Sequence, residues 1–158
     1  MTLPLLLLTL AQASLPAGEL IPDVKCEADP SQSYALYLPK GYDPARAYPV
    51  IFAFDPGARG RMPVERYQAA AEQYGYIVAG SNNSRNGSPQ TGPAVVAMSS
   101  DVLKRFHVDP NRVYVAGMSG GARVAFEVAL KNPTQIAGVL ASSAGFPDAE
   151  PRKTVPFP

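Results

Sequence analysis

A serine flanked by glycines is the residue of this sequence best suited to covalent chemistry. Gly117, Ser119 and Gly121 form the pattern G-x-S-x-G, directly after the apolar run RVYVA. A serine hydroxyl attacks a carbonyl carbon when a base accepts its proton and amide hydrogens stabilise the resulting oxyanion. The pattern therefore predicts Ser119 as the nucleophile of an acyl-transfer reaction. The competing interpretation is a helix-capping serine in a glycine-rich turn of the phosphate-binding type.

The two flanking glycines have a steric reason if Ser119 stands on a tight turn between a strand and a helix. In such a turn, side chains two residues before and after the serine would collide with each other and with the backbone. The helix that follows points its first amides toward the serine, which favours developing negative charge. We therefore expect a strand–turn–helix unit centred on Ser119.

An oxyanion needs hydrogen-bond donors, and two backbone amides are predicted to supply them. One is the amide of Gly120, directly after the nucleophile, and the second commonly comes from the loop after an earlier strand. Here that loop is DPGARG, in which Pro56 has no amide hydrogen, so Gly57 and Ala58 are the candidates. Gly57 is the predicted donor because its missing side chain lets a substrate approach closely. A plain DPG turn is the alternative.

These residues need a scaffold, and the hydrophobic pattern predicts an α/β fold. Apolar runs of strand length alternate with helical periodicities, which is typical of a mostly parallel sheet with helices on both faces. In such sheets, sites form beyond the carboxyl ends of the strands. Strands are expected at 34–38, 49–54, 76–79, 112–116 and 136–141, helices at 63–74, 91–106 and 119–131, and a turn at 109–111. The expected apolar stripes are Val64, Tyr67, Ala70, Ala71 and Tyr74 in the first helix, and Val95, Met98, Val102, Leu103 and Phe106 in the second.

The order of these motifs resembles that of a known superfamily. From about Tyr34 to Phe146, the segments YALYLPKGYD, PVIFAFDPGARG, DPNRVYVAGMSGGARVAFEVA and AGVLASSAGF are similar to serine esterases of the α/β-hydrolase superfamily, especially secreted polyhydroxybutyrate-depolymerase and feruloyl-esterase-like members. The resemblance implies a carboxylic ester hydrolase that acts on a small-molecule or polymeric ester. It also implies a serine that is followed along the chain by an acid and then by a histidine.

The histidine that the resemblance requires does not follow Ser119. The chain contains one histidine, His107, and it precedes the strand that leads to the serine. From Val113 to Gly117 this strand spans about 13 Å at ~3.3 Å per residue, far beyond the hydrogen-bond reach of ~3 Å. We therefore expect His107 to lie at a helix end and not beside Ser119.

Three acidic residues after Ser119 are candidates for the acid of the triad. Glu127 is expected to be solvated in the middle of a helix, whereas Asp148 and Glu150 lie beyond the last predicted strand. The resemblance more often places the acid one strand later than Asp148. We therefore expect a partial α/β-hydrolase fold, in which the strands that bear the acid and the histidine are missing beyond Pro158.

The first residues are predicted to direct export. Leu3–Leu10 form a short apolar run, and Ala11-Gln12-Ala13 offers a small-x-small cleavage site. The run is too short to span a bilayer stably, and the alternative is a buried N-terminal strand or helix. We expect a signal peptide at 1–13, a lead-in at 14–33, the N-terminal part of a hydrolase domain at 34–158, and a secreted or periplasmic protein.

Composition argues against several other classes of function. The formal net charge of +1 gives no broad basic face for nucleic acid. One histidine and one cysteine, Cys26, cannot form a metal site, and a lone cysteine cannot form an intrachain disulfide. No phosphate loop of the G-x-x-x-x-G-K type is present. We expect neither a metal nor a cofactor, and we interpret Cys26 as an incidental thiol.

Two classes of function remain open. The first is an exported serine hydrolase with Ser119 as its nucleophile. The second is a catalytically silent α/β domain that binds a small molecule or a partner. Tyr42, Arg59 and the loop at 82–85 are candidates for lining a substrate cleft, and a solvated surface loop is the alternative for them.

Overall fold

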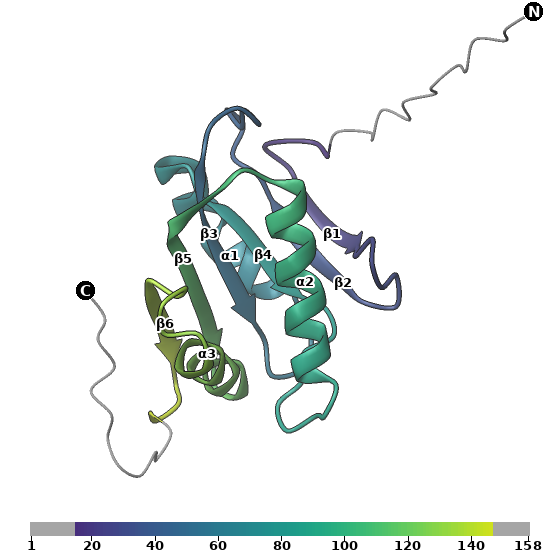
Figure 1. The fold of residues 1–158 in the computed structure, drawn as a ribbon, viewed down its shortest axis with the longest axis vertical. Coiled ribbons are helices and arrows are strands. Elements are labelled where there is room, and N and C mark those ends of the chain that lie inside the picture. Colours follow the sequence, from purple (N-terminus) through teal and green to yellow (C-terminus); the bar gives the residue numbers. More distant parts are fainter. Residues whose placement is uncertain (1–14, 147–158) are drawn as a thin grey trace, which may run out of the picture.

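The computed structural model describes residues 15–146, in which a six-stranded sheet has the order β1-β2-β4-β3-β5-β6 (Figure 1). The predicted signal peptide, Asp148 and Glu150 lie outside the described residues. The strands are β1 (Leu20–Lys25), β2 (Ser33–Tyr37), β3 (Tyr48–Phe54), β4 (Ile77–Ser81), β5 (Val108–Met118) and β6 (Gly138–Ser142), and the helices are α1 (Arg61–Tyr74), α2 (Thr91–Arg105) and α3 (Gly120–Lys131).

The sheet is mostly parallel, as predicted. β3 pairs in parallel with β4 and β5, and β5 pairs in parallel with β6. β2 pairs antiparallel with β4, and β1 antiparallel with β2. β1 was not predicted, because its run LIPDVK contains Pro22 and buries only Val24. Proline is tolerated in an edge strand, and β1 occupies that position.

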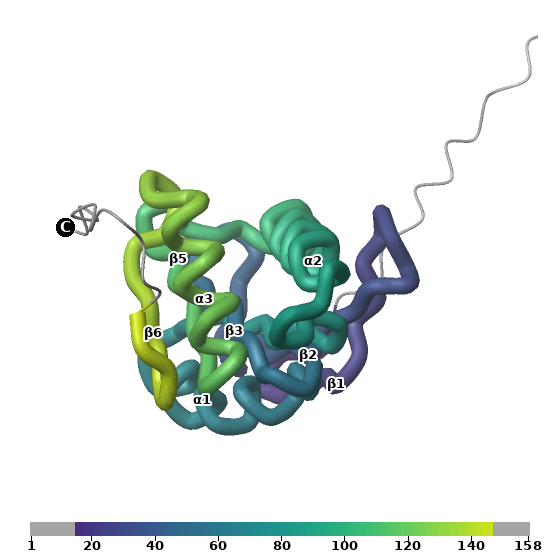
Figure 2. The backbone as a smooth tube through the Cα atoms, turned by 90° about the horizontal axis from the view of Figure 1, so that it is seen from below, coloured from purple at the N-terminus to yellow at the C-terminus, as the bar shows by residue number. Residues whose placement is uncertain are grey.

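The apolar run of β3 contributes to the core on both sides of the sheet. Val50, Phe52 and Phe54 belong to the cluster that includes residues of α2 and α3, whereas Ile51 and Ala53 belong to the cluster that includes residues of α1. Successive residues of a strand face opposite sides, so α2 and α3 cover one face and α1 covers the other (Figure 2). The predicted helices on both faces are therefore confirmed.

The buried stripes of α1 and α2 are narrower than predicted. Tyr74 is 67% exposed and Leu103 is 51% exposed, whereas both were expected in the core. At about 100° per residue, Tyr74 lies roughly 80° around α1 from the buried Val64, and Leu103 lies roughly 140° around α2 from the buried Met98. Ala70, also expected in the core, is exposed as well.

The turn predicted at 109–111 lies within β5 instead. β5 starts at Val108, and its pairing with β3 shifts register between the Tyr48–Val108 pair and the Val50–Val113 pair. The Asp-Pro-Asn stretch is therefore an irregularity inside a longer strand. A proline without an amide hydrogen is compatible with such an irregularity, because the ladder is interrupted there.

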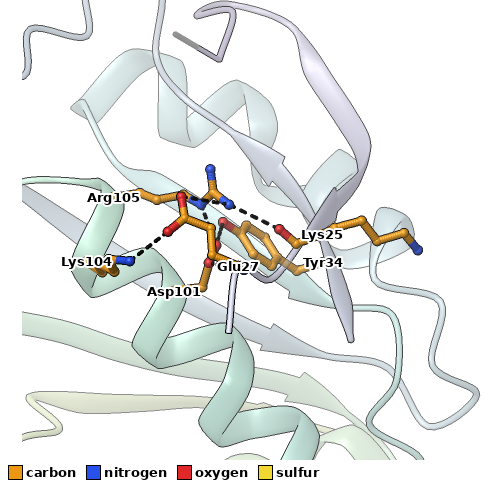
Figure 3. A network of polar contacts seen from close by, with 6 residues as sticks. All are labelled: Lys25, Glu27, Tyr34, Asp101, Lys104 and Arg105. Atoms are coloured by element: carbon orange, nitrogen blue, oxygen red, sulfur yellow. Dashed lines mark hydrogen bonds and ion pairs between the residues drawn. The ribbon is translucent and has the colours of Figure 1, made fainter. Parts of the chain in front are cut away.

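A buried carboxylate ties β2 and the segment after β1 to α2 (Figure 3). Asp101 accepts hydrogen bonds from the Tyr34 hydroxyl at 2.7 Å and the Glu27 amide at 2.8 Å, and it pairs with Arg105 Nε at 2.6 Å. Burial alone would raise the pKa of Asp101, but the hydrogen bonds and the Arg105 charge outweigh burial and lower this pKa below its usual value. Lys104 adds an ion pair to Glu27 at 2.7 Å.

The cysteine belongs to the core that α2 and α3 cover. Cys26 is 1% exposed, and it packs in the same cluster as Tyr34 and Val102. Burial raises the pKa of its thiol to about 11. The thiol is therefore protonated at neutral pH and is a poor nucleophile.

Replacing Asp101 by Asn should destabilise the fold by about 3 kcal/mol at pH 7, because Arg105 loses a buried partner. The folded-state pKa of Asp101 is lowered, so its carboxylate stabilises the fold fully above the unfolded-state pKa of about 4. This contribution is lost as the pH falls through the folded-state pKa. The difference in free energy of unfolding between the wild type and Asp101→Asn should therefore shrink below about pH 4. Urea unfolding of both proteins at pH 7 and at pH 3 measures it.

The matched control is Asp109→Asn. Asp109 pairs with Arg112 at the surface, where the two side chains are 23% and 48% exposed, and exposed ion pairs contribute little to stability. We expect this variant to unfold close to the wild type. Equal stabilities of the Asp101→Asn and Asp109→Asn proteins at pH 7 would show that the buried carboxylate does not hold the fold together.

Candidate active site

Ser119 lies on the turn between β5 and α3, where the motif predicts it. β5 ends at Met118, and α3 begins at Gly120. The backbone of Ser119 has φ 53° and ψ −119°, a combination that residues with a side chain rarely adopt. Such strain persists only where the surrounding structure imposes it, and it is concentrated at functional sites.

The flanking glycines allow three pieces of backbone to meet at this turn. A Cβ on Gly117 would lie 2.2 Å from the carbonyl carbon of Gly121, and a Cβ on Gly121 would lie 2.1 Å from the carbonyl oxygen of Phe54. Both distances are far below van der Waals contact. α3 therefore begins directly against the ends of β3 and β5, and the steric reason predicted for both glycines is present in the structure.

Backbone hydrogen bonds fix the turn on either side of the serine. The Ser119 amide donates to the carbonyl of Ser142 at the end of β6, at 2.8 Å. The Ser119 carbonyl accepts from the amides of Ala122 and Arg123, at 3.0 and 3.3 Å. Gly120 is the first residue of α3, and the first amides of a helix have no acceptor within it. The Gly120 amide is thus positioned to bind a negatively charged atom beside the serine.

The loop after β3 is held by a buried carboxylate. Asp55 is 4% exposed and accepts the Gly57 amide at 2.8 Å and the Arg59 side chain at 2.8 and 3.0 Å. Burial alone would raise the pKa of Asp55, but the bonds from Arg59 and from the Gly57 amide lower this pKa below its usual value. The Ala58 amide donates to the Asp55 carbonyl at 3.2 Å. Both candidate loop amides are therefore engaged within the loop, and a role for Gly57 in oxyanion binding stays a prediction.

The loop after β4 reaches the same edge of the sheet, where it precedes α2 (Figure 1). Gly57 and Arg85 form an antiparallel bridge, and the Asn86 amide donates to the Pro56 carbonyl at 3.3 Å. A Cβ on Gly120 would lie 2.5 Å from Asn86 Cβ and 2.9 Å from Asn86 Nδ2. The sequence pattern did not predict that Asn86 lies beside the serine turn. The polar run SNNSRNG after a buried strand was the signal, but nothing within it distinguishes this asparagine.

Two asparagines of the same loop hold the sheet together and do not line the site. Asn82 Nδ2 donates to the Pro22 carbonyl at 3.1 Å, and Asn83 Oδ1 accepts the Ser33 amide at 2.8 Å. These bonds join the end of β4 to β1 and β2. The suggestion that the stretch 82–85 lines a substrate cleft is therefore wrong for Asn82 and Asn83.

Tyr42 and His107 lie at the opposite, amino edge of the parallel strands. The Tyr42 ring packs against the rings of Tyr48 and Phe106, with centroids 5.0 and 5.9 Å apart. The Tyr48 amide, at the start of β3, donates to the His107 carbonyl at 2.9 Å. The whole of β5 separates His107 from Ser119, as expected. Tyr42, suggested for a substrate cleft, is a packing residue at this far edge.

The acids predicted after Ser119 do not reach it within the described part of the chain. Glu127 lies in α3, is 59% exposed in its side chain and pairs with Lys131, which confirms that it is solvated. A small cavity of about 70 Å³ adjoins the serine turn on the side of α1, lined in part by Asp55, Met118 and Ser142. Among residues 15–146, no cluster of three or more acidic, histidine or cysteine side chains could hold a metal ion.

Comparison with solved structures identifies the fold. The carboxylesterase EstE1, cloned from a metagenomic library, aligns with 80% of this chain over 47% of its own length, with a TM-score of 0.62 and 18% identity. An S-formylglutathione hydrolase from Agrobacterium tumefaciens aligns with 70% of this chain over 51% of its own, with a TM-score of 0.58 and 19% identity. The chain has the α/β-hydrolase fold. A CE1 ferulic acid esterase from Anaeromyces mucronatus aligns over 88% of this chain and 64% of its own, with a TM-score of 0.57 and 14% identity.

The chain spans about half the length of the first solved structures it matches. No family model matches the sequence, and no curated protein does. In the α/β-hydrolase fold, a G-x-S-x-G turn presents its serine at the top of the sheet, and Ser119 occupies the corresponding strand–helix turn. Within residues 15–146, no helix is both long and apolar enough to cross a bilayer.

Replacing Gly117 by Ala should destabilise the fold by more than about 3 kcal/mol, because the new Cβ would overlap the backbone of Gly121. Gly92 supplies the control. Nothing lies within 4 Å of a Cβ at this position in the first turn of α2, so Gly92→Ala should be neutral or stabilising by up to about 1 kcal/mol. Thermal and urea unfolding compare the two variants. Similar stabilities would contradict the close backbone approach at the serine turn.

Proposed function

We propose that this protein is a serine hydrolase that cleaves carboxylic esters, with Ser119 as its nucleophile. The observation that supports the proposal is the strained backbone of Ser119 between β5 and α3. A helix-capping serine ordinarily has an extended backbone and accepts an amide of the first turn with its side chain. Ser119 has φ 53° and makes no such side-chain bond, so the capping interpretation accounts for neither feature.

The proposed substrates are small-molecule or polymeric carboxylic esters. The α/β-hydrolase fold of this chain is shared with a carboxylesterase and a ferulic acid esterase, and this supports the choice of reaction class. The Gly120 amide and the N-terminal end of α3 favour negative charge beside Ser119. Such charge develops on the carbonyl oxygen when an ester is attacked.

The proposed reaction proceeds through an acyl-enzyme. Ser119 Oγ forms a bond to the ester carbonyl carbon, the π electrons of the carbonyl move to its oxygen, and the hydroxyl proton passes to a base. The Gly120 amide donates to the oxyanion. Collapse of this intermediate breaks the bond to the alcohol, which leaves with the proton. Water, activated by the same base, then attacks the acyl group, releases the acid and restores the serine hydroxyl.

We propose that the base and the acid of the triad come from outside these 158 residues, from further residues of a complete protein or from another chain. The sequence contains one histidine, and His107 lies at the amino edge of the sheet, on the far side of β5 from Ser119. Without a base the serine hydroxyl stays protonated and reacts slowly. The same observation favours the second candidate function, a catalytically silent domain that binds a small molecule or a partner.

Chemical rescue distinguishes the two functions. We expect that the purified chain, mixed with p-nitrophenyl acetate and imidazole, becomes acetylated on Ser119, because free imidazole accepts the proton that a positioned histidine would take. The acyl-enzyme should accumulate, since no positioned base activates water for its hydrolysis. Imidazole alone also releases p-nitrophenol from this ester, so the rate is measured on the protein itself. Mass spectrometry of the peptide that contains residue 119 locates the acetyl group and follows its increase with time.

The controls are Ser119→Ala and Ser100→Ala. The first should abolish the imidazole-dependent acetylation, whereas the second removes an exposed hydroxyl from α2 and should leave it unchanged. A wild-type chain that is never acetylated on Ser119, even at high imidazole concentration, would refute the nucleophile and favour the silent domain.

We also propose that the protein is exported. The support comes from the sequence, in which the apolar run Leu3–Leu10 precedes the small-x-small site Ala11-Gln12-Ala13. N-terminal sequencing of the native product should therefore start near Ser14. A product that begins at Met1 or Thr2 would contradict processing at this site.

A further inference from the structure

We propose that the side-chain amide of Asn86 is the second donor to the oxyanion, beside the backbone amide of Gly120. This assignment rests on the proposed function, because it concerns the same serine. Removing one donor from the oxyanion hole of a serine hydrolase slows the reaction by about 10²–10³-fold. An efficient site therefore needs a second donor near Gly120 that is free to bind the substrate oxygen.

The loop after β3, where the sequence predicts this donor, has its candidate amides engaged. The Gly57 amide donates at 2.8 Å to the carboxylate of Asp55, and the Ala58 amide donates to the Asp55 carbonyl. A hydrogen bond to a buried carboxylate is stronger than one between neutral groups. Turning Gly57 toward a substrate would break that bond and leave part of the carboxylate unsatisfied.

Asn86 is close enough to share one oxygen with Gly120. Asn86 Nδ2 lies 2.9 Å from the position of a Cβ on Gly120, and that position is roughly 2.4 Å from the Gly120 nitrogen. The two nitrogens are therefore at most about 5.3 Å apart. Two donors that each hold an oxygen at about 2.9 Å can be up to about 5.8 Å apart. One oxyanion can thus accept from both.

The side chain of Asn86 is free, while its backbone is held. The residue is exposed, and its side chain has no hydrogen bond to any other described residue. Its own amide donates to the Pro56 carbonyl at 3.3 Å. The Ser88 amide closes the turn onto the Arg85 carbonyl at 3.1 Å, around Gly87 with φ 72°. A donor on a fixed backbone loses little freedom when it binds, which is the property required of an oxyanion donor.

The same contact explains the glycine directly after the serine. A Cβ on Gly120 would lie 2.5 Å from Asn86 Cβ, so any side chain at position 120 would push Asn86 away. Glycine at 120 has no positive φ to explain it, since the strained residue is Ser119. The space that Gly120 leaves is the space into which the Asn86 side chain fits.

The test compares acylation of the chain and its variants by p-nitrophenyl acetate in the presence of imidazole. Asn86→Ala should lower the saturating acylation rate by about 10²-fold with little change in the half-saturating ester concentration, because the bond forms only as the oxyanion develops. Asn86→Asp has a side chain of the same shape but with a carboxylate in place of the amide that donates. We expect its acylation to be slower still. Melting temperatures should stay near that of the wild type, since the side chain bonds no other described residue.

Gln90→Ala is the matched control, because Gln90 is an exposed amide side chain in the same loop. We expect the Gln90→Ala protein to be acylated at the wild-type rate. If Ser119 is acetylated in the wild type and Asn86→Ala reacts as fast, the assignment of Asn86 is overturned and the proposed function stands. If Asn86→Ala changes only the half-saturating concentration, Asn86 is a ground-state contact and the assignment is also overturned. If the wild type is never acetylated on Ser119, both proposals fail.

Discussion

The approach of α3 to the end of β3 is the contact on which the arrangement around Ser119 depends. Because Gly121 has no side chain, the first turn of the helix packs directly on the Phe54 carbonyl. The loop that begins at Asp55 therefore leaves the sheet beside the serine turn, and its bridge from Gly57 brings Arg85 and Asn86 to the same edge. A side chain at 121 would separate the helix from β3 and move the serine away from both loops.

Two buried carboxylates stabilise opposite parts of this fold through the same physical effect. Asp55 organises the loop after β3 and Asp101 joins α2 to β2, and each has a lowered pKa although burial alone would raise it. In both cases an arginine four residues later on the chain supplies the charge, and backbone amides supply further donors. Polar groups are tolerated at these buried positions because several donors surround each carboxylate.

Sequence reasoning predicted the sheet, the helices on both faces and the place of Ser119, since these depend on local patterns. The apolar runs of β3 and β5 and the glycines at 117 and 121 are short-range signals. It missed β1, whose proline-containing run has no strand pattern of its own and is stabilised by antiparallel pairing with β2, and it assigned Tyr42 to the wrong edge of the sheet. It also could not single out Asn86, because the contact with Gly120 joins residues that are far apart in the sequence. Contacts of this kind follow from tertiary packing, which local patterns do not encode.

The hydrogen bond between the Ser119 amide and the Ser142 carbonyl sets an order of events during synthesis. The ribosome completes β5 and α3 before it adds β6, so the serine turn of a nascent chain lacks this restraint until β6 has emerged and paired with β5. A strained backbone conformation persists only when its surroundings impose it, and β6 adds one of the contacts that hold Ser119 at φ 53°.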